Sequence, residues 1–201
     1  EFIIHGVVRH QLLVDPRVPC TSHNSTATIL LGEKKALTPD SLKALFLRVK
    51  DIMLDNFNPG SDPGLCVLSE VPGSVVEFGL AAKKRLVSQG EARKTAHDHG
   101  ILLEGLGGTE DGVIGALASV GLSSTGSDGR YVLVGSIREL GGLQPVATVI
   151  SAGVSAIMTM EGEHVTDGLV LTDKLRPARR NFAPIAYVKQ NAGHWEPLKL
   201  D

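Results

Sequence analysis

One segment of the chain, residues 113–120 (VIGALASV), is apolar around the whole circumference of the helix that it favours. Such a helix does not lie on a surface, because every side of it would expose apolar atoms to water. Other elements must therefore surround it. A chain of 201 residues is long enough to do so, since it can bury roughly 70 % of the surface that its unfolded form exposes.

The elements around this helix alternate between strand-like and helix-like patterns. Apolar and β-branched runs predict strands over residues 2–13, 26–31, 65–68, 101–103 and 131–137. Capping signals predict three helices, which begin at Thr38-Pro39, at Ser74 with Glu77 and at Ser88 with Glu91. The order predicts an α/β fold, or an α+β fold, with helices packed on a mixed sheet.

Beyond Gly141 the pattern changes to β-rich segments that turns separate. These segments are residues 146–150, 154–160, 168–172 and 185–189. We therefore expect two parts: an α/β domain over residues 1–140 and a small β-rich module over residues 141–201 packed on it.

Composition limits the classes of partner. Lys and Arg number 20 and Asp and Glu 22, a formal charge of -2, so a positive field over the whole surface is excluded and any RNA contact must be local. The 2 cysteines build no disulfide framework, which predicts a cytoplasmic protein. Polar residues interrupt the longest apolar run, residues 143–160, so we expect buried core and no membrane partner. The sequence does not predict an oligomeric state.

The glycine-rich turn over residues 105–112 (GLGGTEDG) is the strongest candidate for chemistry. Closely spaced glycines let backbone N–H groups approach a ligand, and the following helix N-terminus favours a phosphate. In that interpretation the phosphate contacts are Gly107, Gly108, Thr109 and Gly112, while Glu110 and Asp111 hold a magnesium ion. The structural alternative is that Thr109 caps the helix, the two carboxylates complement its dipole, and Gly112 and Gly115 permit close packing.

A second cluster combines Arg9 and His10 with the polar loop that contains His23, Asn24 and Ser25. Guanidinium, imidazole and amide groups together can bind phosphate or position a polar substrate. The alternative is structural, because loop Ser and Asn side chains mostly satisfy their own backbone. A basic run over residues 174–180 (KLRPARR) either touches RNA phosphates or forms a solvated loop.

Four segments in this order resemble the archaeal tRNA-isoleucine agmatinylcytidine synthetase family. They are residues 9–19 (RHQLLVDPRVP), 21–25 (TSHNS), 62–64 (DPG) and 112–118 (GVIGALA). The family has an R-L-N-P-x-I-P type segment, a K-T-R-G-N loop, an N-P-G turn and a G-R-G-L-I-G-A-L-A helix start at these places. The likeness covers about residues 7–137, and the last motif is the most specific.

The resemblance implies a nucleotide-binding, kinase-like domain over residues 1–140 that uses ATP and Mg²⁺ to phosphorylate a cytidine carbonyl of tRNA. It implies catalytic roles for Arg9, His10, His23 and Asn24. Nucleotide contacts would come from residues of the loop, the turns and the helix start: Ser25, Asp62, Gly64, Gly107, Gly108, Thr109 and Gly112. The family's aspartate-rich D-D-T-D segment lies upstream of the strand that opens this chain.

Two of the family's basic loops have lost their positive charge here, at residues 21–24 and 109–112. We therefore expect an ATP- and Mg²⁺-dependent phosphoryl-transferring enzyme whose partners are a nucleotide and a small-molecule substrate, with at most weak tRNA contact. One alternative keeps tRNA as the substrate. Another is a non-catalytic module that senses a nucleotide or binds a partner.

Overall fold

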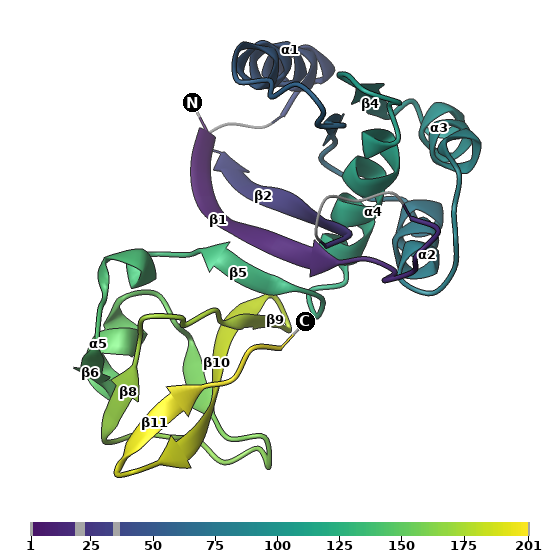
Figure 1. Cartoon of the computed structure of the whole chain (residues 1–201). Coiled ribbons are helices and arrows are strands. Elements are labelled where there is room, and N and C mark those ends of the chain that lie inside the picture. The colour runs from purple at the N-terminus through teal and green to yellow at the C-terminus, as the bar shows by residue number, and fades with distance from the viewer. Residues whose placement is uncertain (1, 19–22, 34–36, 201) are drawn as a thin grey trace. The chain divides into compact units, whose positions relative to one another are not determined.

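The computed structural model describes residues 2–18, 23–33 and 37–200 (Figure 1). Contacts group them into two compact units: a first unit of residues 11–28 and 33–124, and a second of residues 2–10, 29–32 and 125–201. The chain therefore passes from one unit to the other more than once. The domains expected at 1–140 and 141–201 divide the chain differently and stay a prediction.

Four helices lie in the described part of the first unit: α1 (Pro39–Asp55), α2 (Gly73–Ala82), α3 (Gln89–Asp98) and α4 (Gly112–Ser124). Two predicted starts are confirmed. Thr38 caps α1 through the backbone N–H of Ser41, with Pro39 in the first turn. Ser88 and Glu91 form the predicted capping box of α3.

The capping box predicted at Ser74 and Glu77 is wrong. Helix α2 begins one residue earlier, and Pro72 occupies the N-cap position without a side-chain hydrogen bond. The carbonyl of Pro72 accepts from Val75 and Val76, so the backbone starts the helix by itself. The hydroxyl of Ser74 is used elsewhere, 2.8 Å from Nε2 of His99.

Helix α4 is the buried helix that the sequence predicts, and α2 packs along it (Figure 1). Glycines permit the close approach. A Cβ built on Gly121 would lie 2.1 Å from the carbonyl oxygen of Val75, and one on Gly79 would lie 2.8 Å from that of Ala118. Fully buried Val113, Leu117 and Leu122 of α4 join the apolar core of this unit.

A small separate sheet supports the N-terminal end of α4. Its strands are β3 (Gly64–Val67) and β4 (Leu102–Gly105), which pair antiparallel from Gly64 opposite Gly105 to Val67 opposite Leu102. These strands fall where the sequence predicts them. They fix the ends of two loops, residues 58–63 and 106–111, that meet at the start of α4.

The second unit contains a mixed sheet with the order β2-β1-β5-β9-β10-β11-β8-β6, with β7 beside β10. Two pairs, β7 with β10 and β8 with β11, are parallel and the other recorded pairs are antiparallel. The strands are β1 (Phe2–Gln11), β2 (Ser25–Glu33), β5 (Arg130–Leu133), β6 (Leu143–Pro145), β7 (Ala156–Met158), β8 (Leu169–Leu171), β9 (Ala178–Arg180), β10 (Ala183–Asn191) and β11 (His194–Pro197). With its helices, the fold fits the expected α/β or α+β class.

Residues 146–150, predicted as a strand, instead form helix α5 (Val146–Ser151). Val146 and Val149 are both buried and lie three residues apart, on one face of a helix. Packing of that face therefore overrides the β preference of these branched residues. A short 3-10 helix, η1 (Ile137–Glu139), follows β5 and ends the strand predicted over residues 131–137.

The core of the second unit gathers apolar residues from the sheet, α5 and the connecting loops. Its fully or nearly fully buried members include Val8, Val149, Val154, Ile157, Val170 and Val188. The long apolar run over residues 143–160 is only partly core, because Val146, Val149 and Ile157 are buried whereas Leu143, Ile150 and Met160 are exposed. Among the described residues, no helix has both the length and the hydropathy needed to cross a bilayer.

Candidate functional site

The turn over residues 105–112 and the loop before β3 meet at the start of α4. The backbone N–H of Leu106 donates to the carbonyl of Pro63 at 2.8 Å. Gly64 and Gly112 lie so close that a Cβ on either would come within 2.2 Å of the other segment's backbone. Glycine is required here by close approach, because both residues have negative φ and any side chain would collide.

Asp62 directs its carboxylate at the N-terminal end of α4. It accepts from the backbone N–H of Thr109 at 3.3 Å, of Asp111 at 3.3 Å and of Gly112 at 3.4 Å, and from the Thr109 hydroxyl. Burial alone would raise the pKa of Asp62, but these hydrogen bonds outweigh it and hold the pKa below its usual value. The turn therefore stabilises an anion that the protein itself supplies, the Asp62 carboxylate.

Of the predicted nucleotide contacts, Asp62, Gly64, Thr109 and Gly112 meet at this point. Gly107 packs against the Phe57 ring, and Gly108, at φ +66, lies beside Ser61 and Asp62. All these residues belong to the first unit. The structure thus brings together the glycines, the threonine and the aspartate that the sequence singled out.

Glu110 and Asp111, the candidate magnesium ligands, are tied to α3. Arg93 donates to a Glu110 carboxylate oxygen at 2.5 Å, and Gln89 donates to Oδ1 of Asp111 at 2.8 Å. Gln89 also donates to the carbonyl of Thr109 at 2.7 Å. In the described part of the chain no group of three or more His, Cys, Asp or Glu side chains forms a ready metal cage.

No protein-family model matches the chain, and no curated protein matches it.

Asn24 and its neighbours have structural partners. The Asn24 amide donates to the carbonyl of Leu13 at 3.0 Å, while its own carbonyl accepts from the backbone N–H of Leu12 and the Gln11 amide. Ser25 begins β2, and His23 is exposed. This arrangement matches the structural alternative for the loop, because the Asn24 side chain joins its own segment to the segment of Leu12 and Leu13.

The start of β2 runs along α4. The Thr26 side chain lies 3.5 Å from the position of a Cβ on Gly115, and the Thr28 hydroxyl donates to the carbonyl of Ser119 at 2.9 Å. A Cβ on Gly115 would thus make only ordinary van der Waals contact with Thr26, so close packing does not require glycine at this position. The segment around Asn24 and α4 belong to the same unit.

Arg9 and His10 belong to the second unit, and the catalytic roles that the resemblance implies for them stay a prediction. His10 is fully buried, and its Nδ1 lies 2.8 Å from Oδ1 of Asp128. Gly129, at φ +80, closes over this pair, because a Cβ there would lie 2.8 Å from the imidazole. The buried ring has the surroundings of a structural histidine.

The basic run over residues 174–180 is not the solvated loop that the sequence suggested. Ala178 and Arg179 are buried, and residues 178–180 form β9. The Arg179 guanidinium donates to the Tyr131 hydroxyl at 2.6 Å and lies 5.8 and 5.3 Å from the ring centroids of Tyr131 and Phe182. Apolar neighbours in the sequence, Leu175 and Pro177, carry the run into the interior.

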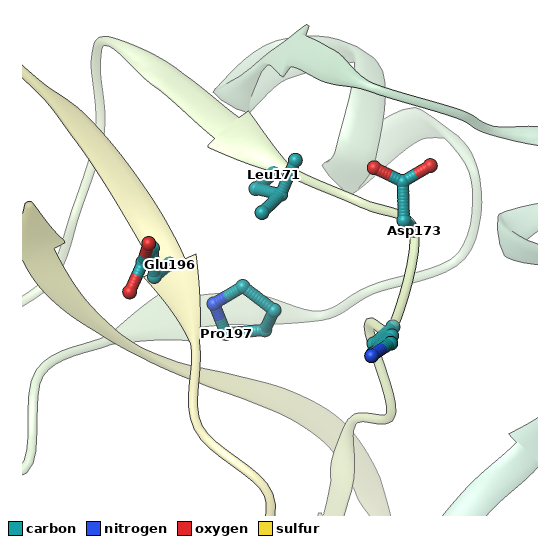
Figure 2. Close-up of a pocket in the computed structure, with 5 residues that line it drawn as sticks. Leu171, Asp173, Glu196 and Pro197 are labelled. Carbon is teal, nitrogen blue, oxygen red and sulfur yellow. The ribbon is translucent and has the colours of Figure 1, made fainter.

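An open depression of about 370 Å³ lies in the second unit, lined by Leu171, Asp173, Lys174, Glu196 and Pro197. Figure 2 shows Leu171 and Pro197 between the carboxylates of Asp173 and Glu196. Both carboxylates are already engaged: Asp173 accepts from the N–H of Gly142, and Glu196 from the Asn191 amide. None of the predicted site residues lies here.

Sequence reasoning missed Gln89 and Arg93, which hold the acidic residues of the turn. The capping box at Ser88 located their helix, but exposed polar side chains on a helix have no signature that names their partners. The resemblance named Asp62 as a nucleotide contact, but the order D-P-G by itself did not indicate that this carboxylate caps α4. Only the fold gives such a signal: strand β3 follows the turn at residues 62–64, and its pairing with β4 places this turn beside the start of α4.

Proposed function

We propose that the chain is an ATP- and Mg²⁺-dependent phosphoryl-transferring enzyme that acts on a small molecule or a nucleotide. The observation that supports this function is the convergence of Asp62, Thr109 and the 107–112 turn on the N-terminal end of α4. Three backbone N–H groups and one hydroxyl there donate to a single carboxylate. Such a set of donors is suited to an anionic ligand.

The residues suit phosphate that carries magnesium better than bare phosphate. A bare phosphate would have to displace the Asp62 carboxylate and would face Glu110 and Asp111. Carboxylate oxygens are the ligands that Mg²⁺ prefers, and in nucleotide sites one or two of them suffice beside the phosphate oxygens. When bound, Mg²⁺ neutralises phosphate charge and joins the phosphate to the protein's carboxylates.

The chain's own residues would then position the phosphates. Gln89 and Arg93 restrain Asp111 and Glu110, so the carboxylates are held before a ligand arrives. Gly108 and Thr109 are exposed and lie where the turn is open to solvent. The catalytic roles expected for Arg9, His10, His23 and Asn24 stay predictions, and the proposal does not depend on them.

The test is binding of ATP with and without Mg²⁺ to the whole chain, followed by thermal unfolding and by release of phosphate. Gly108→Val is a poor probe, because a Cβ there would meet the Ser61 carbonyl at 3.0 Å and φ is +66. Asp111→Asn is better, since it keeps the shape and removes charge. We expect it to weaken Mg²⁺-dependent ATP binding at least tenfold, whereas Asp40→Asn on exposed α1 changes nothing.

A non-catalytic nucleotide-sensing module is the second candidate. The hydrogen bonds of Asp62 favour it over an enzyme, because a turn whose donors are already engaged has fewer groups left to position a phosphate that is being transferred. ATP that stabilises the fold without any turnover would support this candidate. No stabilisation at millimolar ATP, with or without Mg²⁺, would exclude both. The tRNA alternative has lost Arg179 as a phosphate contact, because that residue is buried.

A further inference from the structure

A turn that directly follows β8 carries two opposite charges side by side. The N–H of Leu175 donates to the carbonyl of Thr172 at 3.0 Å, so Asp173 and Lys174 occupy the two central positions of a β-turn. Thr172 and Leu175 are 3 % and 2 % exposed, whereas the two charged residues between them are exposed. The interior of the second unit therefore holds both ends of the turn and leaves its charged side chains at the surface.

A hydrogen bond also fixes the carboxylate of Asp173. Its Oδ1 accepts from the N–H of Gly142 at 3.1 Å, and the carbonyl of Gly142 accepts from the N–H and the hydroxyl of Thr172, each at 2.9 Å. In the described part of the chain, Oδ2 of Asp173 accepts no hydrogen bond, and no carboxylate pairs with the Lys174 ammonium. One acceptor and one cation are thus held in place without an ionic partner.

The turn forms one wall of the open depression of about 370 Å³. Figure 2 shows Leu171 and Pro197 between Asp173 and Glu196, so the depression has an apolar surface between its two carboxylates. The charge of Glu196 is offset within its own hairpin, because Nζ of Lys189 lies 3.8 Å from its Oε2. The charges that the depression leaves unmatched are therefore the neighbouring carboxylate and ammonium of the turn.

We propose that this depression binds a free α-amino acid with an aliphatic side chain. The α-ammonium group donates to Oδ2 of Asp173, and the α-carboxylate accepts from the Lys174 ammonium. The aliphatic side chain covers Leu171 and Pro197, which removes apolar surface from water. A volume near the lower end of the roughly 300–1,000 Å³ that ligand pockets span suits a molecule of this size.

The choice of a zwitterion follows from the pair of charges. An amine alone would leave the Lys174 ammonium without a partner, and a carboxylic acid alone would do the same to the Asp173 carboxylate. An α-amino acid carries both charges close together, as the turn does. The depression and the turn at α4 share no residue, so the inference goes beyond the proposed ATP-dependent function.

The test is a calorimetric titration of the whole chain with L-leucine, without ATP or Mg²⁺. A small ligand in an open site makes few contacts to offset the cost of association, so we expect saturable binding with a Kd of about 1 mM. Asp173→Asn keeps an oxygen for the Gly142 N–H and removes the charge, while Lys174→Gln removes the ammonium. Each should weaken binding about tenfold, the usual effect of losing a hydrogen bond to a charged group. The matched controls, Glu161→Gln and Lys43→Gln, remove exposed charges elsewhere and should change nothing.

Three smaller probes test the parts of the ligand. 4-Methylpentanoate lacks the ammonium group, 3-methylbutylamine lacks the carboxylate and glycine lacks the aliphatic side chain, so each should bind about tenfold more weakly than leucine. The proposal is overturned by the absence of saturable binding at about 20 times the expected Kd, by an equal loss in the controls, or by any smaller probe that binds as tightly as leucine. Should Asp173→Asn fail to fold, Lys174→Gln gives the same comparison, because no hydrogen bond of the described residues depends on the Lys174 side chain.

Discussion

Asp62 and Thr109, which 47 residues separate, hold each other through both the backbone N–H and the hydroxyl of the threonine. The same carboxylate also receives the N–H groups of Asp111 and Gly112. A residue from a loop before β3 thereby caps a helix that begins far along the chain. The cap is tertiary, and it couples the small β3–β4 sheet to the buried helix α4.

Replacement of Asp62 by Ala should lower the stability of the protein by about 1–2 kcal/mol, the usual effect of removing an N-cap acceptor. Asp62→Asn keeps an oxygen acceptor and should lose less than half of that. Asp40→Ala in the exposed first turn of α1 serves as the control. Urea unfolding of the three variants measures the effect. If Asp62→Ala matched Asp40→Ala, the hydrogen bonds at α4 would contribute nothing.

The stabilising effect of Asp62 should depend on pH. Its pKa is lower in the folded chain than the ordinary value of 3.8, so the folded state favours the charged form. The contribution is complete above about pH 5, and it is lost as pH falls through the folded-state pKa. The difference in melting temperature between the wild-type protein and Asp62→Asn should therefore shrink between pH 5 and pH 2. A constant difference over that range contradicts the assignment.

The crossing of α2 and α4 should tolerate no side chain at Gly121. Gly121→Ala would place Cβ 2.1 Å from the Val75 carbonyl, and the helices must separate. We expect a loss of about 1–3 kcal/mol, as for other overpacked cores. Gly90→Ala in α3 is the matched control, because its nearest neighbour is a hydroxyl 3.7 Å away. That variant should be neutral or more stable by up to about 1 kcal/mol in the same thermal unfolding experiment.

Cys66 should be unreactive in the folded protein. Burial raises the pKa of its thiol to about 12, so the nucleophilic thiolate is scarce at neutral pH. In a Cys20→Ser background, a thiol reagent at pH 8 should label Cys66 at least a hundredfold more slowly before than after denaturation. Because the folded pKa is raised from 9.0, the contribution of this thiol to stability is present below pH 9 and declines above it. Equal labelling rates would refute the burial of the thiol.

Local signals predicted the elements whose causes are local. Thr38-Pro39 and Ser88 with Glu91 set the starts of α1 and α3 because a cap is made by neighbours in sequence. Residues 113–120 predicted a buried helix for a similar reason: the helix is apolar on every side, so no side of it is suited to water. Such patterns carry their own physical explanation.

Elements that depend on distant partners were not predictable in this way. Val146 and Val149 form a helix because the core of the second unit accepts that face, and their intrinsic preference is for strands. Arg179 is buried in β9, where its guanidinium lies near the rings of Tyr131 and Phe182. The sequence singled out Asp62, Gly64 and Gly112, but the close packing of the two glycines and the bonds from the Asp62 carboxylate to the start of α4 could only be seen in three dimensions.

The pair formed by His10 and Asp128 spans 118 residues of chain, and this span sets the order of events during synthesis. At a ribosomal rate of about 5–20 residues per second, roughly 6–24 s pass between the two residues. During that time β1 has been made but β5 does not exist, whereas β2 follows soon after. β2 can then pair with one edge of β1, but the other edge, which pairs with β5, stays without that partner until residues 130–133 have been made.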